Sequence, residues 1–129
     1  MQKDKLLALA AKVGFVIDKL DEQSFQFEAI GFRCVAFMYP SRQHDDIISL
    51  QLFCGFDNQP GPGLVHAWNS EMRFVKARTS PRGQLMLEMD LIVPAEMTAE
   101  HLRDVWRIWN QLMARVPLVF GGAPAGVPV

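Results

Sequence analysis

The fold of this chain is decided by residues 73–93, which read RFVKARTSPRGQLMLEMDLIV. Apolar and polar side chains alternate on both sides of Pro81-Arg82-Gly83, and a period of two is typical of half-buried strands. A three-residue loop with Gly in its last position favours a β-hairpin, because Gly tolerates the left-handed backbone needed there. The stretch therefore predicts two antiparallel strands, over 73–80 and 84–93.

The same alternation predicts the register of this hairpin. If Ser80 pairs with Gln84, one face of the hairpin is apolar and the other is polar, and a slip of one residue would turn the apolar set to water. The expected pairs are Val75 with Met89 and Ala77 with Leu87 on the apolar face, and Lys76 with Glu88 and Phe74 with Asp90 on the other. Glu88 and Asp90 could flank a substrate, but a cation opposite them favours a charged sheet surface.

Upstream of the hairpin, the pattern predicts three more strands, over 25–29, 32–39 and 48–54. In the last of these we expect four side chains to face the core: Ile48, Leu50, Leu52 and Cys54. Residues 18–23 are polar and are interpreted as a connection. Short links between consecutive strands indicate an antiparallel meander.

Three helices complete the pattern. Apolar residues at spacings of three and four predict a short helix over 6–13 and another over 64–72, which follows the Pro/Gly-rich break at 57–63. The clearest helix runs over 98–116, with Thr98 as its N-cap. We expect Pro117 to end that helix.

The element order is therefore helix-β-β-β-helix-β-β-helix. It indicates an α+β fold, with an antiparallel sheet that has helices packed on one face. Residues 1–116 form the predicted domain, and residues 117–129 form a Pro/Gly-rich C-terminal tail. At 129 residues the chain is one domain, able to bury about two thirds of its surface without a disulfide or a structural metal.

Charge and cysteine content limit the class of partner and the compartment. With 13 basic and 14 acidic side chains, the formal net charge is −1, so we expect neither nucleic acid nor a membrane surface as a partner. Cys34 and Cys54 lack the spacing of a metal or redox motif and are interpreted as reduced core residues. The apolar run near the N-terminus is too short for a signal peptide, so we expect a cytoplasmic protein.

Candidate catalytic groups are few and isolated. His44, His66 and His101 each lack a neighbouring nucleophile or a set of metal ligands at the usual spacing. The chain has no phosphate-binding glycine loop and no serine nucleophile elbow. Trp106 and Trp109 lie on the apolar stripe of the last helix and are expected to be core. We therefore expect no catalytic residue, no metal, no cofactor and no enzymatic activity.

The segment from Trp68-Asn69 through Arg73-Phe74-Val75-Lys76-Ala77 to the strand 85–91 resembles the YbjN family of bacterial proteins, which are described as sensory transduction regulators. The Thr-capped helix over 98–109 extends the resemblance. It implies an α+β fold similar to that of type III secretion chaperones, which dimerise and bind extended segments of other proteins. His66 stands where the family pattern leads us to expect a second Asn.

Two functions remain open from the sequence. The first is a non-enzymatic bacterial regulatory or chaperone-like module that forms a homodimer and binds another protein. The alternative is a small-ligand-binding or enzymatic domain with a polar pocket near His66, Asn69 and Arg73, because Asn69 and Arg73 would share one face of a helical turn. The residues predicted for the family motif or for a partner or ligand surface are His66, Trp68, Asn69, Arg73, Phe74 and Lys76.

Overall fold

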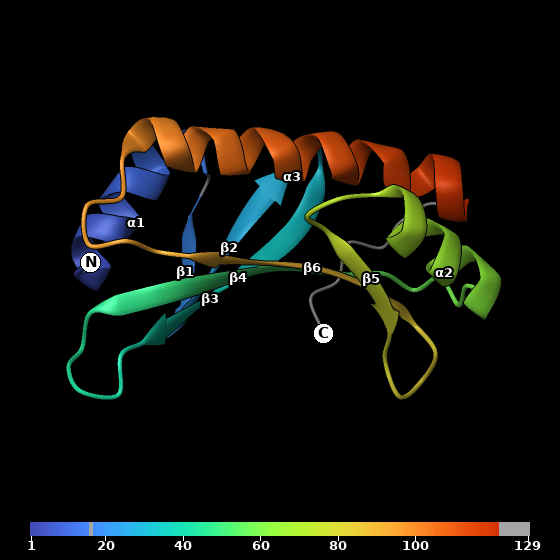
Figure 1. Cartoon of the computed structure of the whole chain (residues 1–129), viewed down its shortest axis with the longest axis horizontal. Coiled ribbons are helices and arrows are strands. Elements are labelled where there is room, and N and C mark those ends of the chain that lie inside the picture. The colour runs from blue at the N-terminus through green and yellow to red at the C-terminus, as the bar shows by residue number, and fades with distance from the viewer. Residues whose placement is uncertain (16, 122–129) are drawn as a thin grey trace.

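A computed structural model describes residues 1–15 and 17–121 of the chain. In these ranges the elements are α1 (Lys3–Lys12), β1 (Asp18–Asp21), β2 (Ser24–Ala29), β3 (Phe32–Pro40), β4 (Ile47–Gly55), α2 (Pro62–Glu71), β5 (Lys76–Thr79), β6 (Leu85–Ile92) and α3 (Ala99–Phe120). The strands form one antiparallel sheet in the order β1-β2-β3-β4-β6-β5 (Figure 1). This arrangement confirms the predicted α+β class.

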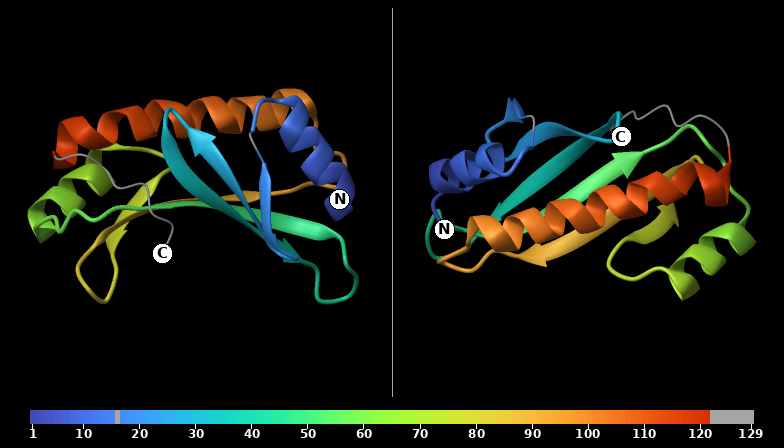
Figure 2. Two further views of the ribbon diagram at one scale, coloured as in Figure 1. Left: turned by 180° about the vertical axis from the view of Figure 1, so that it is seen from behind. Right: turned by 90° about the horizontal axis from the view of Figure 1, so that it is seen from above.

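Helices α1 and α3 lie over one face of the sheet, while α2 lies beside β5 (Figures 1 and 2). Between these two helices and the sheet is an aromatic cluster in which the ring of Phe27 is 5.0 Å from that of Phe15 and 6.4 Å from that of Trp109. Trp109 is fully buried, as expected. Among the described residues, its indole Nε1 is the only buried side-chain nitrogen or oxygen without a hydrogen-bond partner.

The hairpin register is confirmed where the strands pair, but the expected pairs of Val75 with Met89 and of Phe74 with Asp90 are not part of the ladder, because the first strand is shorter than predicted. Lys76 pairs with Glu88 and Ala77 with Leu87, and the Ser80 backbone N–H donates to the Gln84 carbonyl. β5 begins only at Lys76, so the expected start of the strand at residue 73 is wrong. The cause is Phe74, whose φ of 74° is incompatible with an extended strand.

The segment 18–23, interpreted as a connection, contains an additional edge strand. All four residues of β1 are exposed, and β1 pairs with β2 through a register shift between Lys19 and Asp21. A strand with no buried side chain leaves no apolar alternation in the sequence, which is why the pattern did not reveal it.

The predicted core face of β4 is wrong at its first position. Ile47 is buried in the core and Ile48 is exposed, whereas Leu50, Leu52 and Cys54 face the core as expected. The register between β3 and β4 shifts between Tyr39 and Pro40, where a bulge adds one residue to the ladder. That extra residue reverses the alternation.

Helix α3 continues through Pro117 to Phe120, so the prediction that Pro117 ends it is wrong. Proline removes one helical hydrogen bond, but side-chain packing holds the last turn in place. The ring of Phe120 lies 5.6 Å from that of Trp68 on α2, and Val116 is buried. The helix ends at Gly121, where φ is 68°. The predicted tail 117–129 thus begins inside α3, and its residues 122–129 lie outside the described part of the chain.

Candidate functional site

The Trp-Asn pair of α2 has a structural role in attaching this helix to β5. The indole Nε1 of buried Trp68 donates to the Val75 carbonyl at 3.0 Å. The Asn69 side chain donates from Nδ2 to the Ala77 carbonyl at 2.9 Å and accepts at Oδ1 from the Ala77 N–H at 2.8 Å. Asn69 therefore pairs with β5 as a further strand would, and its amide is already occupied.

The turn from α2 into β5 is strained. The Val75 N–H donates to the Arg73 carbonyl at 2.9 Å, and Phe74, between them, has the positive φ of a γ-turn that side chains rarely adopt. The Phe74 ring is 60% exposed, and the Arg73 guanidinium carbon lies 5.3 Å from its centre.

The predicted site residues do not converge on one pocket. Asn69 lies between two open hollows, one of about 360 Å³ beside Phe74 and Lys76 and one of about 420 Å³ beside His66. Its amide, which would have to grip a ligand, already binds β5. His66 contacts Ser70 one turn along α2, at 3.5 Å. The geometry therefore does not favour a small-ligand site gripped by Asn69 and Arg73.

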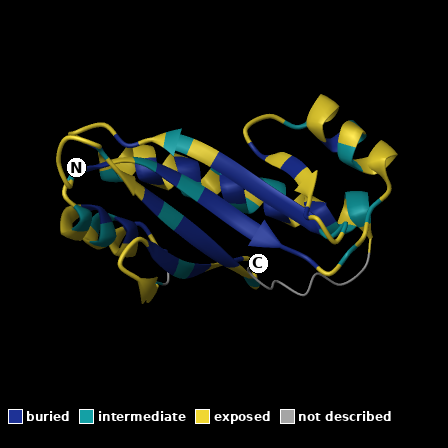
Figure 3. Cartoon of the chain, turned by 90° about the horizontal axis from the view of Figure 1, so that it is seen from below, coloured by how far each residue is buried: buried dark blue, intermediate teal, exposed yellow. Residues whose placement is uncertain are grey.

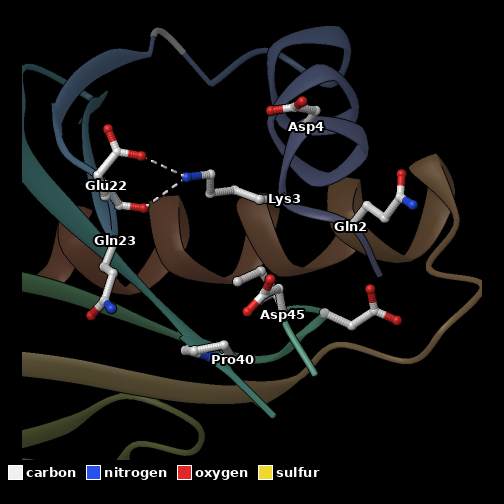
Figure 4. A pocket seen from close by; sticks show the side chains of 9 residues that line it. Gln2, Lys3, Asp4, Glu22, Gln23, Pro40 and Asp45 are labelled. Atoms are coloured by element: carbon white, nitrogen blue, oxygen red, sulfur yellow. Dashed lines mark hydrogen bonds and ion pairs between the residues drawn. The ribbon is translucent and has the colours of Figure 1, made fainter. Parts of the chain in front are cut away.

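A hollow of about 520 Å³ lies where α1 meets the β3–β4 loop (Figure 4). The Nζ of Lys3 donates both to the Glu22 carbonyl and to its Oε2, each at 3.1 Å. Hydrogen bonds from Lys19 and then Lys3 lower the pKa of Glu22. Asp4, Asp45 and Asp46 complete the charged lining, which was not predicted as a site. A group of acids of this kind does not by itself indicate a ligand.

Both edges of the sheet are protected against pairing with another strand. On one side, Asn69 occupies the N–H and carbonyl of Ala77 in β5. On the other, β1 is short, irregular and charged at Asp18, Lys19 and Asp21. These are the usual devices that prevent edge-to-edge association. A partner would therefore bind more readily to a face of this sheet than to an edge.

The face opposite α1 and α3 is not covered by any helix in the described part of the chain (Figure 3). We call it the open face. Side chains that point to it alternate with the core residues of each strand. Across β2, β3, β4, β6 and β5 its central rows are Gln26, Val35, Phe53, Glu88 and Lys76, then Glu28, Arg33, Gly55, Met86 and Arg78.

Polar side chains form a connected series across the open face. The Tyr39 hydroxyl donates to Gln51 Oε1 at 3.4 Å, and Gln51 Nε2 donates to Glu88 Oε2, also at 3.4 Å. The other carboxylate oxygen of Glu88 lies 3.1 Å from Arg78 Nε. The expected charged surface is thus present, although Glu88 is itself buried and its ionic partner is Arg78 instead of Lys76.

Apolar side chains are exposed at one end of this face. Tyr39 and Ile92 flank Ser49 of β4 from either side and are 45% and 77% exposed. Ile48, beside Ser49, is 48% exposed, and half-buried Phe37 is two residues from Tyr39 on β3. We call Phe37, Tyr39, Ile48 and Ile92 the open-face patch. Phe37 connects this patch to the buried Phe53, since their rings are 6.3 Å apart.

One protein family matches the chain over most of its length. Residues 4–119 match the YbjN family, whose description is "Putative bacterial sensory transduction regulator". The chain belongs to the YbjN family. No curated protein and no solved structure matches it.

The YbjN match extends from the start of α1 almost to the end of α3. It therefore includes the Trp68-Asn69 motif and the whole open-face patch. In the described residues of this YbjN protein, no three or more His, Cys, Asp or Glu side chains are grouped as metal ligands would be. No described helix is both long and apolar enough to cross a bilayer.

Sequence reasoning missed the open-face patch, although a signal for it exists. Residues 34–38 of β3 read CVAFM, so both faces of this strand are apolar. A strand that is apolar on both faces usually lies between two layers. Among residues 1–15 and 17–121, only one helical layer covers the sheet, and the second apolar face of β3 belongs to the open face.

Proposed function

We propose that this YbjN protein is a non-enzymatic bacterial regulator that forms a homodimer and binds another protein through the open face of its sheet. The observation that carries the proposal is the open-face patch, an exposed apolar surface bordered by the polar series from Tyr39 to Arg78. An apolar centre with a polar rim is the usual composition of a protein-binding surface. Because both sheet edges are protected against strand pairing, the open face is the more favourable surface for a protein partner.

The chemistry of the open face suggests the class of partner. Acidic Glu28 and Asp90 and basic Lys76 and Arg78 lie on the same face, so its charge favours neither strongly acidic nor strongly basic ligands. The patch itself provides four large, partly exposed side chains on three neighbouring strands, β3, β4 and β6. An extended protein segment with apolar side chains at alternate positions fits this arrangement, because such side chains all project to one side.

A selection of random twelve-residue peptides displayed on phage against the purified protein tests the binding site. We expect apolar, alternating sequences, and Ile92→Lys should weaken their binding at least tenfold, because a charge replaces an exposed apolar contact. Leu118→Lys is the matched control, since Leu118 is an equally large residue, 85% exposed at the end of α3. Equal binding by the wild type and both variants would contradict the role of the open face.

The homodimer is tested separately by light scattering after size-exclusion chromatography at micromolar concentration. We expect twice the mass of the chain. A strict monomer would contradict this part of the proposal without affecting the peptide result.

A further inference from the structure

The two cysteines of the chain lie opposite each other in the centre of the sheet. Val35 pairs with Phe53 and Ala36 with Leu52, so the same register places Cys34 on β3 opposite Cys54 on β4. Opposite residues of an antiparallel pair have Cα atoms about 4.5 or 5.5 Å apart, and both values are within the range that a disulfide spans. The backbone therefore already has the spacing of a cross-strand disulfide.

The thiols also point into the same space. Both cysteines are fully buried on the face covered by α1 and α3. The Cys54 Sγ lies 3.4 Å from the carbonyl oxygen of Arg33, to which it donates, so this thiol reaches across to the residue next to Cys34. The Cys34 Sγ is 3.7 Å from the Phe32 carbonyl oxygen. Both thiols are free in the structure.

We propose that Cys34 and Cys54 form a reversible disulfide when the protein meets a peroxide, and that this bond changes the affinity of the open face for its partner. The first thiolate attacks hydrogen peroxide, the O–O bond breaks, and a sulfenic acid and hydroxide result. The second sulfur then attacks the sulfenic sulfur, so that an S–S bond forms and the S–O bond breaks. Two thiols and one peroxide thus give one disulfide and two waters.

The environment of the pair sets the conditions for this reaction. A hydrogen bond with the neighbouring Cys34 thiol and burial both raise the pKa of Cys54, so the thiolate is scarce in the closed core. Oxidation then depends on local opening of the sheet. A peroxide molecule is close to water in size and needs a smaller opening than a protein oxidant would.

The position of the pair connects it to the open face. Phe53 precedes Cys54 and Val35 follows Cys34, and their side chains point to the opposite side of the same two strands. Phe53 contacts Phe37 of the open-face patch. A disulfide brings the two sulfur atoms to about 2.05 Å, closer than non-bonded sulfurs approach. The strands beneath Phe53 and Val35 must adjust to that bond.

Counting alkylated thiols tests the bond. The purified chain is treated with hydrogen peroxide, denatured, alkylated with N-ethylmaleimide and weighed by mass spectrometry. We expect two adducts before peroxide, none after it, and two again after reduction. Adducts are counted because the seven Met residues also gain oxygen from peroxide. Two adducts after long treatment, or a loss of adducts that dithiothreitol does not reverse, would overturn the proposal.

Two variants and one binding measurement complete the test. Cys34→Ala and Cys54→Ala should each lose the reversible protection, which excludes a bond to another molecule. A phage-selected peptide should bind the oxidised and reduced chain with affinities that differ about fivefold or more. This coupling rests on the proposed function, whereas the adduct count does not. A disulfide with unchanged peptide affinity would overturn the coupling alone.

Discussion

The two faces of the sheet carry similar apolar side chains in different surroundings. Phe27 and Phe37 lie on the neighbouring strands β2 and β3, yet Phe27 is enclosed by Phe15, Trp106 and Trp109 beneath α1 and α3, whereas Phe37 is half-buried on the open face. The covered face has the enclosed packing that stabilises a fold. On the open face, Phe37 and the rest of the open-face patch stay partly exposed and contribute less to folding, whereas Val35, Phe53 and Met86 at its centre are buried. Burial, more than residue type, therefore distinguishes Phe27 from Phe37.

The largest expected effect compares these two phenylalanines directly. Phe27→Ala should lower the free energy of unfolding by about 3–5 kcal/mol, because it leaves a cavity in the aromatic cluster. Phe37→Ala should lower the free energy of unfolding by only about 1 kcal/mol, because the Phe37 side chain is already partly exposed in the folded protein. Urea unfolding followed by circular dichroism measures both. Equal losses would contradict the distinction between the faces.

A second prediction concerns the edge that limits the open face. Asn69→Ala removes two hydrogen bonds to Ala77 and leaves the β5 backbone without these partners, so the free energy of unfolding should fall by about 2 kcal/mol. Exposed edge groups should also promote association at high concentration. Ser70→Ala, at the next position of α2, is the control. If both variants unfold at the same urea concentration, Asn69 is not needed at the edge.

The third prediction concerns Pro117 in α3, the long helix over the covered face. Pro117→Ala gives α3 the N–H that proline lacks near its last turn, and the free energy of unfolding should rise by about 1 kcal/mol. The gain stays modest, because proline also restricts the unfolded chain and the Ala variant gives up that stabilisation. Thermal unfolding monitored by circular dichroism checks it. A lower midpoint would show that proline fits this turn better than we infer.

The smallest effect lies outside both faces, at Glu22. Its lowered pKa means that the folded protein binds this proton less tightly than the unfolded chain. Its contribution is therefore present above the ordinary pKa of 4.5 and is lost as the pH falls through the folded value. Glu22→Gln should melt slightly below the wild type at pH 7 and at the same temperature near pH 3. A difference that persists in acid would contradict this.

Sequence patterns predicted the elements in which apolar residues recur at the spacing of a strand or a helix. The β5–β6 register followed from alternation and Gly83, and the start of α3 followed from Thr98, whose hydroxyl accepts from the His101 N–H at 3.1 Å. β1 was missed because it buries nothing. Ile47 was missed because a bulge changes the alternation, and a bulge depends on the partner strand.

The candidate site was predicted less well, for a similar reason. The sequence singled out Trp68 and Asn69, and both are structurally important, but it could not show that the Asn69 amide is used by Ala77, eight residues further along the chain. The open-face patch depends on which face α1 and α3 cover. Residues 34–38 indicate that β3 is apolar on both faces, but tertiary packing decides which of the two faces the helices cover.

The unpaired indole N–H of Trp109 has a practical consequence. An indole that is fully buried and not hydrogen-bonded emits fluorescence at shorter wavelength than one that contacts water. Trp109 lies beside Phe27 on the covered face, while Trp68 donates its N–H to Val75. The emission wavelength of Trp109 therefore reports whether water has entered between α3 and the sheet. The chain thus carries an intrinsic fluorescent probe of that layer.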